Sequence, residues 1–196
     1  MFKACLSSVC ALVLTLGVSL SAQANWYLDG ESSRLSFITT QNANVANVHR
    51  FLVLHGKVNS KGQAQLRIEM DSVNSAVPLL DERMRDVLFD FKHFPQAQIT
   101  AQIDLQPINN LAPGAQFELR LPVTVSLRGK QHTYDAQLLA TRLDEHRFQV
   151  VTLEPLVVQA EDFGVQPELE TLRKLAGLSA ISFSVPVGAV LIFTAR

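Results

Sequence analysis

Residues 72–99 read SVNSAVPLLDERMRDVLFDFKHFPQAQI and make the one long interruption in a chain that otherwise alternates like a series of β-strands. Within this stretch apolar residues recur at the spacing of one helix face, at Leu80, Met84, Val87/Leu88 and Phe91. Pro78 and Pro95 bracket the stretch, as helix-flanking prolines do. We therefore expect an amphipathic helix here. It is either a lid or plug over the open end of a barrel or sandwich, or an ordinary core-packing helix.

The flanking sequence alternates apolar and polar residues with the period of two that is typical of strands. The alternation is clearest over residues 64–71, 97–106, 117–128 and 181–188. Further strands are expected at 25–29, 34–40, 45–58, 132–143 and 147–160, the last interrupted at Pro155. A second short helix is expected at 168–176, capped by Gly177. About eight such strands predict an all-β domain, either an antiparallel barrel or a two-sheet sandwich.

The first 24 residues have the pattern of a signal peptide. Lys3 is followed by an apolar run over residues 9–20, too short to span a bilayer, and by a small-x-small site at 22–24. We expect cleavage after Ala24, a single domain over 25–196 and a periplasmic location. Both cysteines, Cys5 and Cys10, fall in the leader, so we expect no disulfide and no cysteine metal site.

Composition argues against several classes of protein. The chain has 17 basic and 18 acidic side chains and no Lys/Arg-rich run, so nucleic acid is not an expected partner. No apolar run after the leader predicts a transmembrane segment, and one Trp with two Tyr cannot form the aromatic girdles of an outer-membrane barrel. The five histidines are scattered, and no known catalytic motif is present, so we predict no metal site, no catalytic residues and no enzyme.

Phenylalanine is the dominant aromatic residue, with 11 copies in the chain. Some cluster at the end of the expected helix, and others lie in or beside the expected strands. Any single ring is explained as core filler. A barrel interior must nevertheless hold either side chains or a ligand, so the set as a whole leaves both readings open.

Four short motifs carry a resemblance to a known family. They are the opening strand with Trp26-Tyr27-Leu28-Asp29, the helical segment with Ser72-Val73, Arg83-Met84-Arg85 and Phe89, the turn Phe94-Pro95-Gln96-Ala97, and the late turn Asp162-Phe163-Gly164. In this order and spacing the chain resembles the YceI-like family of periplasmic polyisoprenoid- or lipid-binding proteins over its whole mature length. It departs from the family pattern at Leu88, where an acidic residue is common, and at Ala160, where an arginine is common.

The resemblance implies a lipocalin-like antiparallel β-barrel of about eight strands, with one or two short helices at its opening. It also implies a binding or carrier protein for an apolar lipid, namely an isoprenoid such as a quinone or polyprenyl chain, and no other cofactor. A structural or interaction protein with a barrel filled by its own side chains remains the alternative. An enzyme would need a titratable cluster, for which Arg83, Asp162 and His93 are the only candidates. A homodimer is left open.

On this hypothesis the ligand-binding residues fall into two groups. The inward strand positions expected to line the interior are Phe37, Leu66, Ile68, Ile99, Ile103, Leu119, Leu121, Phe183 and Val185. Phe51 is added to this group, although the alternation leaves the parity of its strand open. The residues expected to gate it are Met84, Leu88, Phe91 and Phe94. Arg83 and Arg85 are either contacts for a polar head group or part of a solvated helix face.

Overall fold

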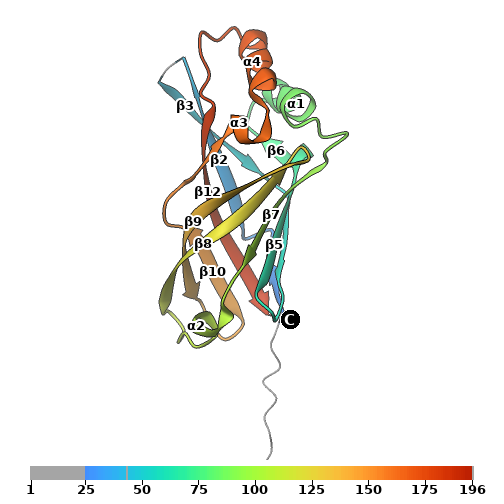
Figure 1. Cartoon of the computed structure of the whole chain (residues 1–196). Helices are drawn as coiled ribbons and strands as arrows, with labels where there is room; N and C mark the ends of the chain where they lie inside the picture. Colours follow the sequence, from blue (N-terminus) through green and yellow to red (C-terminus); the bar gives the residue numbers. More distant parts are fainter. Residues whose placement is uncertain (1–24, 43, 196) are drawn as a thin grey trace, which may run out of the picture.

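The computed structural model describes residues 25–42 and 44–195, so the predicted leader at 1–24 lies outside the described residues. The strands close into one antiparallel barrel of eight strands (Figure 1), which confirms the predicted fold class. Three of the eight are bent into two segments. The segments are β1 (Trp26–Leu28), β2 (Arg34–Gln41), β3 (Val45–Phe51), β4 (Leu54–Val58), β5 (Gln63–Glu69), β7 (Gln96–Gln102), β8 (Gln116–Leu127), β9 (Lys130–Arg142), β10 (Arg147–Thr152), β11 (Leu156–Gln159) and β12 (Ser184–Ala195).

Neighbours around the barrel follow chain order. The bent strand β1/β2 pairs with the bent strand β3/β4, and the order continues through β5, β7, β8, β9 and the bent strand β10/β11 to β12. Strand β12 then returns to both β1 and β2, which closes the ring. The short strand β6 (Val73–Asn74) pairs with β3 outside the ring. Closure of this kind removes the free edges that an open sheet would expose.

Side-chain hydroxyls occupy backbone donors where the strands bend. Between β1 and β2, Ser33 Oγ accepts the N–H of Ile192 at 2.9 Å and donates to the carbonyl of Asp29 at 2.6 Å. Gly30 lies at the same corner, where a Cβ would stand 2.8 Å from the carbonyl oxygen of Leu54. The corner therefore requires a glycine for the close approach and a buried hydroxyl for the interrupted hydrogen-bond ladder.

At the other two bends a side-chain hydroxyl also accepts a hydrogen bond from a backbone N–H. Ser72 Oγ accepts the N–H of Val53 at 3.1 Å between β3 and β4, and Thr152 Oγ1 accepts the N–H of Ala189 at 3.2 Å between β10 and β11. Pro155 lies at the second of these bends, as the sequence predicted, because proline has no N–H to give to the ladder.

The helices gather at the two ends of the barrel. Helices α1 (Pro78–Arg83), α3 (Ala160–Phe163) and α4 (Gln166–Leu175) lie together at one end, and α2 (Leu105–Asn109) lies at the other (Figure 1). A 3-10 turn η1 (Met70–Ser72) precedes β6, and a π-helical segment η2 (Met84–Phe89) continues α1 without a break. We call the end covered by α1, η2, α3 and α4 the capped end.

The predicted helix begins at Pro78 as expected but ends earlier than predicted. The left-handed conformation of Asp90, with φ of 48°, stops it after Phe89, so Phe91 lies beyond the helix. His93 N and Phe94 N both donate to the carbonyl of Asp90, which forms the turn into β7. The second predicted helix is present as α4, beginning two residues before the predicted start.

Two strand predictions were too long. The strand expected to continue to residue 106 ends at Gln102, because Asp104 accepts the N–H of Gln106 at 3.0 Å and starts α2. The last strand begins at Ser184, so the alternation read from Ile181 and Phe183 precedes it.

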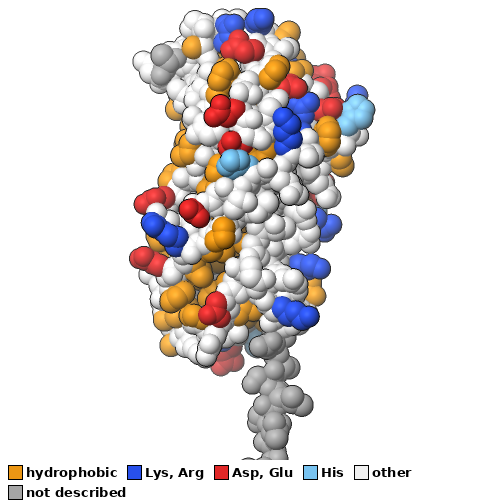
Figure 2. Space-filling view, viewed as in Figure 1, with side chains coloured by type: hydrophobic (Ala, Val, Ile, Leu, Met, Phe, Trp, Pro, Cys, Tyr) orange, Lys and Arg blue, Asp and Glu red, His pale blue; other side chains and the backbone are white. Residues whose placement is uncertain are grey.

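The inward faces of the strands and the buried sides of α4 and η2 form a large apolar core, and Leu121, Val123 and Ala136 form a second, smaller cluster. On the face shown in Figure 2, acidic and basic side chains are intermixed rather than gathered into a field of one sign, consistent with the formal net charge of −1. Within the described residues, no helix has the length and apolar character needed to cross a membrane.

Candidate functional site

Two apolar cavities lie inside the barrel, one above the other along its length. The upper cavity, about 150 Å³, lies beneath the capped end, where Leu88 and Phe89 of η2, Phe163 of α3 and Leu169 of α4 close it. Its walls are inward residues of the strands, including Phe37, Phe51, Ile68, Val125 and Val185. The alternation in the sequence produces this lining, because every second residue of each strand faces inward.

The lower cavity, about 170 Å³, lies between the middle of the barrel and α2. Leu105 and Ile108 of α2 form part of its floor. Trp26 lines it from β1 and packs edge-on against Phe148 of β10, with ring centroids 4.8 Å apart. Its remaining walls are mainly small and branched apolar side chains, among them Leu66, Ile103, Leu121, Val123 and Ala136.

Four residues line both cavities: Leu35, Ile99, Leu156 and Val187. We call this set the waist. Because the waist belongs to both linings, the two cavities adjoin there along the length of the barrel. The barrel is therefore not packed solid with its own side chains among the residues described.

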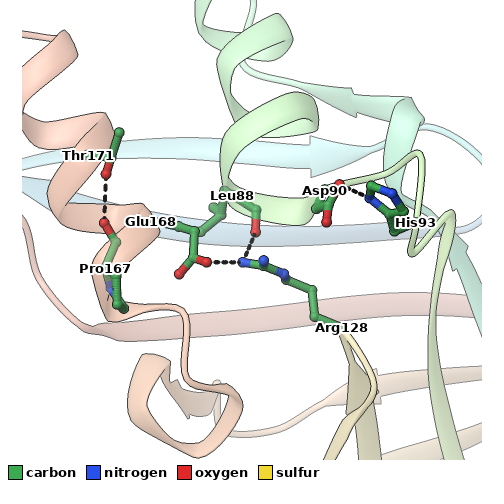
Figure 3. A network of polar contacts seen from close by, with 7 residues as sticks. All are labelled: Leu88, Asp90, His93, Arg128, Pro167, Glu168 and Thr171. Atoms are coloured by element: carbon green, nitrogen blue, oxygen red, sulfur yellow. Dashed lines mark hydrogen bonds and ion pairs between the residues drawn. The ribbon is translucent and has the colours of Figure 1, made fainter.

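An arginine on the β8–β9 hairpin holds the capped end together (Figure 3). The Nη1 of Arg128 lies 2.8 Å from Oε1 of Glu168 in α4 and donates to the carbonyl of Leu88 in η2 at 3.2 Å. One side chain thus joins a hairpin, a π-helix and an α-helix. The other carboxylate oxygen of Glu168 is buried and has no hydrogen-bond partner in the described part of the chain.

One polar pair is buried at the upper cavity. Thr39 of β2 lines the cavity, and its Oγ1 lies 2.8 Å from Nε2 of His49 on β3. His49 is only 2 % exposed, its ring packs 5.1 Å from that of Phe37, and its Nδ1 has no partner among the described residues. Burial lowers the pKa of His49 below its ordinary value, against the opposing attraction of Asp81 in α1. The imidazole is therefore neutral at neutral pH.

The barrel wall has a seam between residues 130–136 of β9 and β11. Strand β11 pairs with β12. On its other side β9 pairs with β10 over residues 138–142 of β9, so this pairing does not extend past the bend between β10 and β11. Tyr134 spans this seam, since its hydroxyl donates to Oδ2 of Asp162 at 2.6 Å and accepts the N–H of Gln159 at 3.4 Å. Burial, with the hydrogen bond to Asp162, raises the pKa of Tyr134. A cavity of about 170 Å³ at the seam shares Leu156 with both interior cavities.

The structure brings most of the predicted ligand-binding residues to the two cavities. Those that line the upper cavity are Phe37, Phe51, Ile68, Leu88, Ile99 and Val185. Those that line the lower cavity are Leu66, Ile99, Ile103 and Leu121. Apart from Leu88 of η2 and Phe51, whose parity the sequence left open, these positions lie on the inward strand face that the alternation predicted.

Five predicted residues line neither interior cavity. Met84 is buried in the large core and Phe91 is partly buried against it, whereas Leu119 is partly buried against the smaller cluster. Phe94 lies in the turn before β7, where its ring approaches Gly129 of the β8–β9 hairpin. The inward placement predicted for Phe183 was wrong: this ring is 39 % exposed, because it precedes the regular part of β12.

Sequence reasoning missed several lining residues. Trp26, Phe148, Phe163, Leu156 and Val187 all line a cavity but were not among the predicted ligand-binding residues. Val187 shares its strand parity with Val185, and this signal was sufficient to find it. Nothing in the local sequence shows that Phe163, from a short helix, reaches the upper cavity.

The residues considered for head-group binding or catalysis lie in separate networks. Arg83 donates to the carbonyl of Leu175 at 3.1 Å, His93 contacts Asp90 at 2.8 Å, and Asp162 contacts Tyr134 and His132. No group of three or more metal-ligating side chains occurs in the part of the chain that the structure describes.

Comparison with known proteins gives a family and several structural relatives. The family described as the YceI-like domain matches residues 26–192. A polyisoprenoid-binding domain from Saccharophagus degradans, described as implicated in plant cell wall breakdown, is 36 % identical, with a TM-score of 0.85. That match covers 87 % of this chain and 98 % of the other.

Two more distant relatives share the fold. BcnA of Burkholderia cenocepacia is 18 % identical with a TM-score of 0.66, over 84 % of this chain and 98 % of its own. A YceI protein of Campylobacter jejuni is 14 % identical with a TM-score of 0.50, over 76 % of this chain and 84 % of its own. No curated protein sequence matches this chain.

Proposed function

The chain belongs to the YceI-like domain family, and from this premise we propose that it binds an apolar isoprenoid lipid inside its barrel and carries it in the periplasm. The observation that carries the proposal is the pair of stacked apolar cavities that meet at the waist. The relative from Saccharophagus degradans, a polyisoprenoid-binding domain, supports the same class of ligand. The signal-peptide pattern at residues 1–24 supports the periplasmic location.

The physical chemistry of the interior favours a chain-like ligand. Each buried methylene contributes about 0.8 kcal/mol, so a dozen of them contribute about 10 kcal/mol. That gain is comparable with the cost of about 4–15 kcal/mol for restricting a bound molecule. A narrow apolar interior about as long as the barrel suits an extended prenyl chain, which would pass the waist by displacing the side chains of Ile99 and Leu156.

The cap gives the proposed carrier a way to shield its ligand from water. Leu88 and Phe89 of η2 and Leu169 of α4 lie directly over the upper cavity. Arg128 ties both elements to the β8–β9 hairpin (Figure 3). The proposed role is binding and carriage without catalysis, since the titratable groups near the cap are tied into separate structural networks.

The test is native mass spectrometry of the protein purified from its own periplasm without detergent, followed by organic extraction. We expect an adduct that extraction removes and that is identified as a prenyl chain. If the purified protein carries no adduct, it is incubated with a prenylated lipid and measured again. Absence of an adduct after this incubation would refute the proposal.

A matched pair of variants assigns the adduct to the interior. Ile99→Trp fills the waist and should abolish the adduct at a cost of about 1–3 kcal/mol in stability. Gln98→Trp, one residue away on the opposite face of β7, should leave it unchanged. Retention of the lipid by folded Ile99→Trp protein would place the ligand elsewhere.

A further inference from the structure

The most exposed apolar side chains of the described residues gather at the capped end of the barrel. Five of them, which are between 48 % and 67 % exposed, come from the β2–β3 hairpin, the start of α1 and the end of α4: Val45, Val48, Val77, Leu79 and Leu175. We call these five residues the rim. Single exposed apolar residues need no explanation, but a group of them at one end of a molecule marks a contact surface.

The hairpin between β2 and β3 projects beyond the barrel wall (Figure 1). Residues 44–46 near its tip are all exposed, so both faces of the strand are in solvent there. Strand β6 pairs with β3 only at Arg50 and Phe51, farther from the tip. Val45 and Val48 therefore stand on a part of the chain that leaves the barrel and faces solvent.

Two sets of hydrogen bonds join the segments that carry the rim. Asn42 Oδ1, at the tip of the hairpin, accepts the N–H of Ser179 at 2.8 Å and its hydroxyl at 2.9 Å, beyond the end of α4. Arg83 Nη1 donates to the carbonyl of Leu175 at 3.1 Å, which joins α1 to the end of α4. Leu79 and Arg83 are four residues apart, so they share one face of α1. The rim is thus held as one surface.

The charge of this surface is basic at its outermost part. Three segments carry the rim: residues 38–48, 72–80 and 171–183. They contain no Asp or Glu, and their charged residues are Arg173 and Lys174. Arg173 pairs with Glu170 at 2.8 Å, whereas Lys174 is exposed, and basic side chains stand at the outer end of the molecule over α4 in Figure 2. Glu82 of α1 is also exposed, so apolar contact rather than charge should supply most of the affinity for a partner.

A bilayer surface fits the rim better than a protein partner does. Figure 1 shows the hairpin and the ends of α1 and α4 as separate projections, whereas a stable protein interface needs about 800 Å² of closely fitting surface on each partner. Apolar side chains with Lys and Arg beside them are typical of segments that lie in the head-group region of a membrane. Lys and Arg can reach lipid phosphates while their methylene groups stay in contact with the apolar layer.

The rim lies at the same end as the cap of the upper cavity. Leu88 and Phe89 of η2 and Leu169 of α4 close this cavity, and η2 and α4 directly adjoin the segments that carry Leu79 and Leu175. A molecule that docks through the rim would therefore present the cap, rather than the α2 end, to the membrane.

We propose that the rim docks the capped end onto a membrane surface that contains anionic lipid. The five apolar side chains enter the head-group region, and Lys174 and Arg83 contact lipid phosphates. The upper cavity then lies next to the bilayer from which an apolar ligand is taken or to which it is delivered. This last step rests on the proposed function, whereas docking itself is measured without any ligand in the barrel.

The experiment is co-sedimentation of the protein purified from its periplasm with two kinds of vesicle: phosphatidylcholine alone, and phosphatidylcholine mixed with phosphatidylglycerol. The native chain should bind the mixed vesicles more tightly, and added salt should reduce this difference. Leu79→Ser and Leu175→Ser should each weaken binding to both kinds of vesicle about tenfold. Lys174→Gln should weaken binding about fivefold on the mixed vesicles only.

Two matched variants at the α2 end serve as controls. Leu143→Ser changes an exposed leucine in the turn after β9, and Lys61→Gln changes an exposed lysine in the β4–β5 turn. Neither should alter vesicle binding. The inference is overturned if the native chain binds neither kind of vesicle, or if Leu143→Ser weakens binding as much as Leu79→Ser does.

Two further measurements separate the other outcomes. Analytical ultracentrifugation without vesicles would overturn the inference if it shows a dimer that Leu79→Ser separates, because the rim would then be an interface between copies. Native mass spectrometry of the same samples reports the lipid adduct independently. Vesicle binding without any adduct would support docking and count against the proposed function, whereas an adduct without vesicle binding would do the reverse.

Discussion

The guanidinium of Arg128 lies 2.8 Å from the carboxylate of Glu168, and this contact joins the β8–β9 hairpin to helix α4 across the capped end of the barrel. Both side chains are mostly buried, at 18 % and 25 % exposed. The same nitrogen also binds the carbonyl of Leu88. Arg128 therefore fastens both η2 and α4 to the hairpin, although these two elements come from distant parts of the sequence.

Replacing Arg128 with alanine should destabilise the fold by about 1–3 kcal/mol, because Glu168 and the carbonyl of Leu88 both lose their partner. The free energy of unfolding in urea measures this. Arg147→Ala is the matched control, since the pair of Arg147 and Asp144 is solvent-exposed and should contribute little to stability. Equal losses in the two variants would show that the contact of Arg128 does not stabilise the cap.

A charge in the lower cavity should prevent lipid uptake. Leu121 is 7 % exposed and lines that cavity, so Leu121→Asp places a carboxyl group against the expected path of the ligand. We expect loss of the lipid adduct in native mass spectrometry, with a stability loss of several kcal/mol. Arg120→Asp, at the neighbouring exposed position, should keep the adduct. Uptake by folded Leu121→Asp protein would exclude this cavity as the binding site.

Acidification should weaken the fold through His49. Because burial holds its pKa below the ordinary value of 6.5, the unfolded chain binds a proton at a higher pH than the folded chain does. The contribution of this residue is complete above about pH 6.5 and falls as the pH drops toward the folded pKa, by up to about 1.4 kcal/mol per pH unit. Urea unfolding at about pH 7.5 and pH 5 should show a smaller decrease in His49→Phe than in the native chain. Parallel decreases would assign the pH dependence to other groups.

The stability of the seam between β9 and β11 should depend on the hydroxyl group of Tyr134. Tyr134→Phe keeps the ring but leaves the N–H of Gln159 and the carboxylate of Asp162 without this partner, so we expect a loss of about 1–2 kcal/mol in stability. Because the seam cavity shares Leu156 with the interior, bound lipid should also dissociate faster. A stopped-flow transfer assay to lipid vesicles measures the rate. Thr133→Val, beside it on the outward face, should leave the rate unchanged, and an unchanged rate in Tyr134→Phe would indicate release through another part of the barrel.

The barrel could be predicted because alternation is a local signal. Leu35 and Phe37, or Leu121 and Val123, are two residues apart and face the same cavity without any long-range information. The start of the helix at Pro78 was likewise predicted from a local sequence signal. The end of that helix was not, because the left-handed turn at Asp90 follows from backbone geometry that no apolar pattern encodes.

The site was less predictable where distant segments meet. The waist combines residues of β2, β7, β11 and β12, and the pair of Thr39 and His49 joins two strands across a hairpin. Phe183 shows the opposite error: its parity was read correctly, but the strand had not yet begun. Parity predicts which face a residue occupies only within the strand itself.

The hydroxyl groups at the strand bends also affect whether two copies of this chain can associate through strand pairing. A bent strand offers free N–H groups, and such groups are a template on which a strand from another molecule can pair. Ser33, Ser72 and Thr152 each occupy one such donor within the chain itself. The three hydroxyl oxygens at the bends thus deny incoming strands a first hydrogen bond, which protects the barrel wall from pairing with strands of another copy.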